Sequence, residues 1–235
     1  MKQIEDLTGA DILADLPSRQ LRALFNDSTI TVYQAYPVEI ATAAIAAQAF
    51  VKPFKLERMT WIKPSFSWMM YRSNWAQRAG QERVLAIQIY RQQFDEALAN
   101  SCLSHFERAV HGSKETWLER KAKSNVVVQW DPERSISLER LTWRSIQIGL
   151  MGSAAKDYAN EWVNEITDVT PSVRDIYELL VAGRADLAKK RAPVEVAYPL
   201  PEYAEIAVGA SRYGSSTWVA PADRSNQSND PNGAG

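Results

Sequence analysis

Cysteine, histidine and long apolar runs are scarce in this chain of 235 residues. Its one cysteine, Cys102, cannot form an internal disulfide framework, which excludes a stapled secreted scaffold. No apolar run is long enough to cross a bilayer, and the acidic, interrupted N-terminus lacks the pattern of a signal peptide. We therefore expect a cytoplasmic protein without a membrane segment.

The usual signatures of cofactor and metal sites are missing as well. No G-x-G-x-x-G motif occurs, and the pair Gly149 and Gly152 lacks the Gly-Lys-Ser/Thr ending of a phosphate-binding loop. The two histidines, His105 and His111, lie near Cys102 but match no standard zinc spacing. Neither histidine has the context of a nucleophilic triad. We therefore predict no metal site.

The chain has an ordinary globular composition, with 46% hydrophobic and 23% charged residues. Such a composition indicates a domain with a sizeable core. Strand-like and helix-like patterns alternate, which predicts a single mixed α+β domain with a small central sheet and flanking helices. We expect a helical N-terminal segment over residues 1–28, the α+β domain over residues 29–210 and a flexible tail over residues 211–235.

Local signals place the individual elements. β-branched and aromatic runs predict strands at residues 29–36, 83–89, 125–130 and 144–150. Proline starts and apolar spacing predict helices at residues 37–48, 65–75, 91–99, 158–166 and 172–180. The alanine-rich helix at residues 37–48 has almost no polar face, so we expect it to be buried.

The net charge of −1 conceals a local excess of positive charge. Residues 52–91 contain eight Lys or Arg and two Glu, a balance of +6. Aromatic residues are interleaved with these cations, and such a segment suits an anionic partner. The alternative is a solvated surface whose charges pair with the acidic flanks.

The densest part of this segment is Met59–Trp75, in which tryptophans recur every seven residues. On a helix that opens at its proline, four side chains share one face: Trp68, Tyr71, Arg72 and Trp75. A guanidinium among aromatic rings can stack and still bind a phosphate. The alternative is an aromatic core helix with the arginine in a structural ion pair.

Polar residues are interleaved with these aromatics, among them Lys63, Ser65 and Ser73. Lys63 and Ser65 bracket the expected start of the helix, where free backbone N–H groups favour an anion. Together with Arg72 they suit the phosphates of a nucleotide whose base stacks on a neighbouring ring.

Two strands add further candidates. The strand at residues 125–130 runs into Asp131 and Glu133, and carboxylates at a strand exit are held in place yet accessible. For Asp131 we favour a turn with the next proline. For Glu133 a catalytic role and a turn role both stay open. In the first strand Gln34, if buried, needs a hydrogen-bond partner, either a ligand or a neighbouring strand.

Three stretches resemble a bacterial and fungal family of unknown function numbered 4291. They are VYQAY at residues 32–36, MTWIKPSFSWMMYRS at residues 59–73, and QWDPER with RSIQIGL within residues 129–150. The resemblance covers about residues 19–200. It implies a relative but no reaction, because the family has none assigned.

The order of these stretches is also similar to the ADP-ribosyltransferase superfamily. There a first-strand residue binds NAD, a middle element stacks the nicotinamide, and a late glutamate assists cleavage of the glycosidic bond. The resemblance implies that Tyr33 or Gln34 has the first role, the Trp68–Arg72 region the second, and Glu133 the third. The candidate cofactor-binding residues are Tyr33, Gln34, Tyr36, Lys63, Ser65, Trp68, Tyr71, Arg72 and Ser73, with Glu133 as the catalytic candidate and NAD as the substrate.

The carboxylate would stabilise the oxocarbenium charge that develops at the ribose, as in glycoside hydrolysis. A nucleotide is thus the expected partner, with nucleic acid as a second candidate. One alternative is a non-catalytic binding module that uses the basic aromatic segment as a stacking platform. Another is an interaction domain whose tryptophans form the core.

Overall fold

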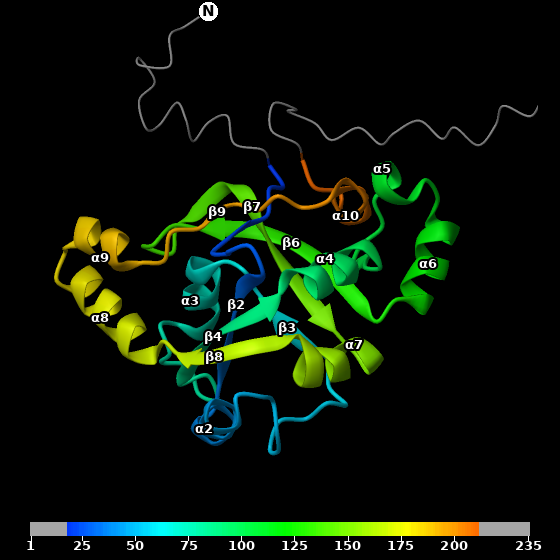
Figure 1. Ribbon diagram of the computed structural model, residues 1–235. Helices are drawn as coiled ribbons and strands as arrows, with labels where there is room; N and C mark the ends of the chain where they lie inside the picture. The colour runs from blue at the N-terminus through cyan, green and yellow to red at the C-terminus, as the bar shows by residue number, and fades with distance from the viewer. Residues whose placement is uncertain (1–17, 212–235) are drawn as a thin grey trace, which may run out of the picture.

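The computed structural model describes residues 18–211, and this part of the chain has a mixed α+β fold (Figure 1). The predicted fold class is therefore confirmed. The expected small central sheet is divided into three sheets. Residues 1–17 of the predicted helical segment and residues 212–235 of the predicted tail lie outside the described residues.

Each sheet joins segments that are distant in the sequence. The three-stranded sheet has the order β2 (Thr29–Tyr36), β4 (Arg83–Tyr90), β8 (Val163–Asp168), with antiparallel neighbours. The four-stranded sheet has the order β3 (Thr60–Ile62), β7 (Arg140–Leu150), β6 (Val126–Arg134), β5 (Cys102–Leu103), and only its β5–β6 pair is parallel. The two-stranded sheet pairs β1 (Arg22–Ala23) with β9 (Val196–Ala197).

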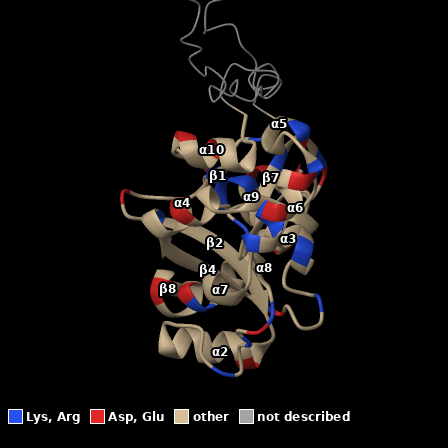
Figure 2. Cartoon of the chain, turned by 90° about the vertical axis from the view of Figure 1, so that its right-hand side faces the viewer, with Lys and Arg blue, Asp and Glu red and all other residues tan. Residues whose placement is uncertain are grey.

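Short helices surround these sheets. They are α2 (Val38–Ala47), α3 (Phe66–Ser73), α4 (Arg91–Ala99), α5 (Arg108–His111), α6 (Lys114–Lys123), α7 (Gly152–Asp157), the π-helical turn η2 (Tyr158–Trp162), α8 (Thr170–Val181), α9 (Ala185–Arg191) and α10 (Glu202–Val208). Figure 2 shows acidic residues on α4 and β8 and basic residues on α3 and α5, so charge of both signs is spread over the fold.

The two larger sheets meet where β2 lies beside β3. The Tyr33 N–H donates a 2.7 Å hydrogen bond to the Lys63 carbonyl oxygen. The Gln34 amide donates to the Thr60 hydroxyl at 2.8 Å and to the Trp61 carbonyl at 3.0 Å. Both amide hydrogens of Gln34 are thus used within the protein. Of the two predicted roles for Gln34, its contacts match the link between neighbouring strands.

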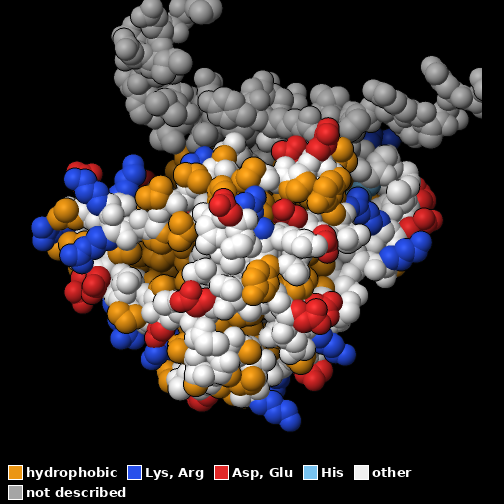
Figure 3. All heavy atoms as spheres, in the orientation of Figure 1, with side chains coloured by type: hydrophobic (Ala, Val, Ile, Leu, Met, Phe, Trp, Pro, Cys, Tyr) orange, Lys and Arg blue, Asp and Glu red, His pale blue; other side chains and the backbone are white. Residues whose placement is uncertain are grey.

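Successive residues of β2 point to opposite faces, as the pleat of a strand requires. Tyr33 is buried against Phe66, with ring centroids 5.6 Å apart, in an apolar cluster that joins α3 to α8 and α9. On the face of Gln34 lies the main core, which contains Tyr158. Figure 3 shows that hydrophobic side chains also reach the surface between α8–α9 and the centre of the molecule.

Two predicted helices are replaced by strands. The described part of the N-terminal segment, residues 18–28, holds β1 and no helix, because Leu21 is buried and its carbonyl accepts a hydrogen bond from the Tyr198 N–H. The helix predicted at residues 158–166 is a π-helical turn followed by β8. Here Ile166 pairs with Ile87, so sheet hydrogen bonds override the local helical pattern.

Two other elements form with different surroundings from those predicted. The alanine-rich helix forms as α2, but only Ala41 and Ala44 are buried, and Val38 is 49% exposed. Its small residues pack against the sheet and the rest faces solvent. Strand β6 continues past the predicted end to Arg134, and Pro132 lies opposite Arg144 of β7 rather than in a turn.

The Gln34 link gives a stability prediction. Its remaining polar atom, Oε1, accepts a 2.7 Å hydrogen bond from the Tyr158 hydroxyl. We expect Gln34→Leu to lower the free energy of unfolding by about 2–4 kcal/mol, because the buried Tyr158 hydroxyl loses its partner and the Thr60 hydroxyl keeps only that of Tyr36. Urea unfolding followed by tryptophan fluorescence measures this loss. Tyr158→Phe removes one bond of the same network, so its loss should be smaller; an unchanged Gln34→Leu variant would contradict the link.

Candidate functional site

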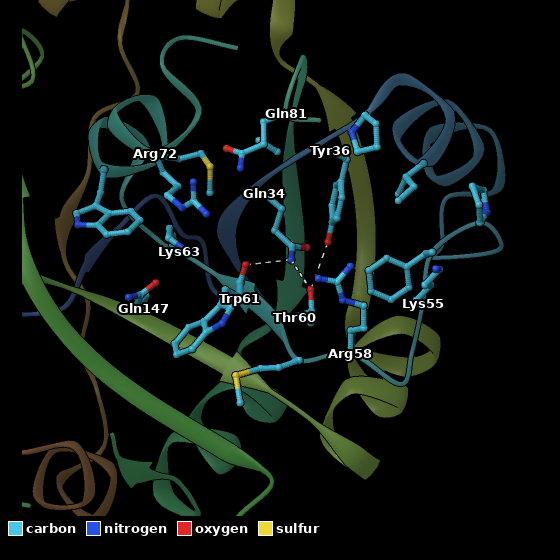
Figure 4. Close-up of a pocket in the computed structure, with 18 residues that line it drawn as sticks. Gln34, Tyr36, Lys55, Arg58, Thr60, Trp61, Lys63, Arg72, Gln81 and Gln147 are labelled. Atoms are coloured by element: carbon cyan, nitrogen blue, oxygen red, sulfur yellow. Dashed lines mark hydrogen bonds between the residues drawn. The ribbon is translucent and has the colours of Figure 1, made fainter. Parts of the chain in front are cut away.

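A pocket of about 610 Å³ opens beside β2, β3 and α3 (Figure 4). Four of its side chains are cationic: Lys55, Arg58, Lys63 and Arg72. Four are aromatic: Tyr36, Phe54, Trp61 and Trp68. Among the residues that the structure describes, no Asp or Glu lines this pocket. The basic aromatic segment predicted from the sequence thus surrounds a cavity, and four of its eight cations converge there.

Lys63 lies at the buried end of this pocket. It follows β3 directly, and its residue exposure is only 4%. Its Nζ lies 4.7 Å from the ring centroid of Trp68 and 5.9 Å from that of Trp61. Within residues 18–211 no side chain or carbonyl accepts a hydrogen bond from Nζ and no carboxylate pairs with it. The rings are its close neighbours.

Burial lowers the pKa of the Lys63 amine to about 7, and the nearby positive charge of Arg72 acts in the same direction. Asp131 opposes this by favouring the ammonium form. The Asp131 carboxylate accepts hydrogen bonds from Gln147 at 2.6 Å and from Gln129 at 2.9 Å. Because Gln147 lines the pocket, Asp131 lies behind this amide rather than in the lining.

Arg72 enters the pocket from the last turn of α3 and stays exposed to solvent. With its amide oriented to satisfy both partners, Gln81 accepts from Arg72 Nη1 at 3.2 Å and donates to the Arg72 carbonyl at 3.1 Å. No carboxylate in the described part of the chain forms an ion pair with Arg72. The guanidinium is therefore held in position by a neutral group and keeps its full charge toward the pocket.

The start of α3 is fixed by a side-chain cap. The Ser65 hydroxyl accepts a 3.1 Å hydrogen bond from the Trp68 N–H and donates at 2.8 Å to Glu133. Such a cap satisfies one of the free N–H groups of the first turn. Ser65 thus places Trp68 at the pocket but does not line the pocket itself.

The end of α3 breaks the face predicted for four residues. The helix ends at Ser73, whose hydroxyl donates to the Met69 carbonyl at 2.9 Å. Asn74, Trp75 and Ala76 then follow with positive φ angles of 50°, 56° and 62°. This left-handed stretch turns the Trp75 ring away from the pocket. The ring is instead buried beside Phe66 and Tyr177.

The candidate residues of the sequence therefore divide into two groups. Gln34, Tyr36, Lys63, Trp68 and Arg72 line the pocket. Tyr33, Ser65, Tyr71, Ser73 and Glu133 do not. Of the second group, Tyr71 is 42% exposed on α3, and the Arg134 guanidinium lies 3.7 Å from its ring centroid.

Sequence reasoning did not single out other residues that line the pocket. Lys55, Phe54 and Arg58 come from the segment between α2 and β3, and Gln147 comes from β7. The +6 balance of residues 52–91 was the available signal for the two cations. Gln147 arrives through the pairing of β7 with β3 and β6, which local patterns do not reveal.

Glu133 lies at the N-terminus of α3 and does not line the pocket. Its carboxylate accepts from the Ser65 hydroxyl and from the Arg134 N–H, each at 2.8 Å. Its residue exposure is 8%, and burial raises its pKa. The structure thus separates Glu133 from the cations with which the sequence grouped it, because β6 directs this carboxylate to the helix cap.

A second carboxylate, Glu195, completes this cap and was not predicted. It accepts a 2.6 Å hydrogen bond from the Phe66 N–H, the first residue of α3. Burial raises its pKa well above the usual range of a glutamate, and the negative charge of Glu133 acts in the same direction. Arg22 lowers the pKa of both carboxyls but does not outweigh burial. Two carboxyls with raised pKa values therefore lie at one helix start.

The rest of the chain within residues 18–211 offers neither a metal cluster nor a membrane-spanning helix. No three His, Cys, Asp or Glu side chains come together there as a metal ion would need. No helix in this range has the length and apolar character to cross a membrane. Cys102 is fully buried, and its Sγ lies 4.0 Å from His111 Nε2. Burial raises the pKa of this thiol, so it is a core residue rather than a nucleophile.

Comparison with known protein families gives a match. A family model described as "Domain of unknown function (DUF4291)" matches residues 20–198. This range contains the pocket, the α3 cap and all three motif stretches, so the family resemblance seen in the sequence is confirmed. No curated protein matches the chain. The similarity to ADP-ribosyltransferases stays a prediction.

The acid pair at the α3 cap gives a pH prediction. A carboxyl whose pKa is raised in the folded state loses stability as pH rises from the unfolded pKa through the folded pKa. We expect Glu195→Gln to raise the free energy of unfolding at neutral pH and to flatten its decline with pH. Each unit of pKa shift is equivalent to about 1.4 kcal/mol.

Urea unfolding at a series of pH values from mildly acidic to neutral measures this effect. The amide oxygen of glutamine can still accept from the Phe66 N–H. Glu178→Gln on the exposed side of α8 is the matched control and should follow the wild-type curve. If Glu195→Gln is less stable than wild type at every pH, the ionised form of Glu195 is the one that the fold prefers.

Proposed function

The chain belongs to the DUF4291 family, and from the pocket described above we propose that it binds a nucleotide. The observation that carries the proposal is the charge of the lining: four cationic side chains and no described carboxylate. An apolar pocket would exclude these charges, and a structural cluster would pair them with acids. Unpaired cations in a concave site favour an anionic ligand.

The positions of the cations suit phosphate groups. Arg72 presents a planar guanidinium whose N–H groups match two phosphate oxygens, and Gln81 leaves it without a competing negative charge. Lys63 is almost fully buried, and a bound phosphate would favour its charged form. An anion placed between these two side chains would neutralise both.

The aromatic lining supports a ligand that also carries a ring. Trp61 and Trp68 flank Lys63, whereas Phe54 packs against Tyr36 with ring centroids 6.0 Å apart. Lys55 and Arg58 lie across the pocket from Lys63 (Figure 4). A base stacked on an aromatic side chain gains about 1–3 kcal/mol. Cations and rings on both sides suit a nucleotide with phosphates between two ring systems. NAD is therefore the candidate ligand that we propose to test first.

Transfer of ADP-ribose from NAD is the chemistry that the sequence suggested. That reaction would need a carboxylate near the ribose, and Glu133 does not line the pocket. We therefore propose nucleotide binding as the function, with NAD cleavage as a further activity to be measured. Single-stranded nucleic acid is the alternative ligand, since the same rings and cations would stack bases and contact phosphates.

Binding is tested by calorimetry with NAD, ADP and a short oligonucleotide. We expect Arg72→Ala to weaken nucleotide affinity about tenfold to a hundredfold, because a charge-assisted hydrogen bond contributes about 1.5–3 kcal/mol. Arg78→Ala is the matched control, since Arg78 is also exposed just after α3 but does not line the pocket. Equal losses for the two variants, or no binding of any nucleotide, would refute the proposal.

Cleavage is measured as nicotinamide release from NAD by wild type and by Glu133→Gln, with and without DNA and RNA. Because Glu133 caps α3 rather than lining the pocket, we expect any release to survive Glu133→Gln at a substantial fraction of the wild-type rate. Loss of release by several orders of magnitude, with NAD affinity unchanged, would instead give Glu133 the catalytic role that the sequence suggested.

A further inference from the structure

The Lys63 amine has an unusual environment for a lysine. Its side chain is almost fully buried, yet it lines a ligand-sized pocket. Its close neighbours are the faces of Trp61 and Trp68, and no described residue accepts a hydrogen bond from Nζ. A lysine that only binds phosphate would be expected at a more hydrated position, where its charge costs less. A buried amine that lines a pocket beside a second cation is in an arrangement that activates a lysine as a nucleophile.

We propose that Lys63 forms an imine with the carbonyl carbon of a phosphorylated sugar or nucleotide. This inference rests on the proposed function, because the same cations would hold the phosphates of that ligand. It adds a substrate class: nucleotides with a free anomeric carbon, which is an aldehyde in the open-chain form. ADP-ribose is such a compound.

The step balances without a further reactant. The lone pair of neutral Nζ attacks the aldehyde carbon, and a carbon–nitrogen bond forms. The carbonyl oxygen leaves as water with the two hydrogens of the amine, and a carbon–nitrogen double bond remains. Because the pKa of Lys63 is about 7, a large share of the amine is neutral at physiological pH.

The surrounding residues suit this reaction. Arg72 lies in the same pocket and disfavours the ammonium form of Lys63. It can hold a phosphate while the amine reacts, so one cation positions the ligand and the other is the nucleophile. The indole rings of Trp61 and Trp68 keep water from the imine, which slows its hydrolysis. The neutral imine carries no charge, so the free-energy cost of burying the Lys63 ammonium group is removed when it forms.

The test is reductive trapping of the full chain with ADP-ribose and sodium cyanoborohydride. Digestion and mass spectrometry then locate the modified lysine. We expect one main adduct at Lys63, with a yield that rises as pH passes about 7 and then levels off. Lys55 lines the same pocket but is exposed, so it serves as the internal control. ADP has the same phosphates and base without the aldehyde, so it should bind but leave no adduct.

The Lys63→Met variant should lose the adduct and keep its fold, because methionine fills a similar apolar volume without a charge. Circular dichroism and urea unfolding show whether this variant is folded. If it is not, the position of the adduct in the wild-type peptide map still tests the proposal. If ADP and ADP-ribose bind but label no lysine, or label Lys55 and surface lysines equally, the imine is refuted while nucleotide binding stands. If neither compound binds, the proposed function itself fails.

Discussion

The junction between β2 and β3 is the constraint on which the site depends. A single backbone hydrogen bond from Tyr33 to Lys63, reinforced by the amide of Gln34, joins two sheets that otherwise have separate strand orders. This junction fixes the position of Lys63, the residue that follows β3, and therefore the point where α3 begins three residues later. Lys63 is buried because it stands at that junction, and Trp68 and Arg72 reach the pocket because their helix starts there.

The start of α3 also separates two kinds of buried charge. On the pocket side lies an amine whose pKa is lowered, and on the other side lie Glu133 and Glu195, whose pKa values are raised. For each of these three groups, burial is the largest cause of the shift and favours the neutral form. Natural proteins accept such locally unfavourable burial mainly at functional positions. The acids serve the helix cap, whereas the amine has no such structural partner.

Local signals were sufficient for much of the fold. Strand β2 and helices α3, α4 and α8 follow from proline starts and from runs of β-branched or apolar residues, with boundaries within a few residues. Helix prediction failed at residues 158–166, because the edge of β4 supplies hydrogen bonds to β8 that the local pattern does not encode. At residues 18–28 the partner strand β9 is equally remote in the sequence.

The sequence predicted which types of side chain form the site better than it predicted which residues supply them. The segment at residues 59–73 gave Lys63, Trp68 and Arg72, because residues one or two helical turns apart remain neighbours in space. Glu195 and Gln147 come from distant segments, and only the tertiary fold brings them to α3 and to the pocket. Three consecutive positive φ angles moved Trp75 out of the predicted face. Asn74 is a residue type that favours this conformation at a helix end, but Trp75 and Ala76 are not.

The pairing of β1 with β9 has a consequence for how the chain folds. Arg22 lies opposite Ala197, and the Ser211 N–H donates to the Arg19 carbonyl, so the first and last described segments lie side by side (Figure 1). Leu21 and Ala23 belong to the main core, yet their backbone partners, Tyr198 and Val196, lie near the other end of the described part of the chain. Contacts of such long range form late and slow the folding of a domain. During synthesis β1 therefore lacks its partner strand until residues 196–197 have emerged.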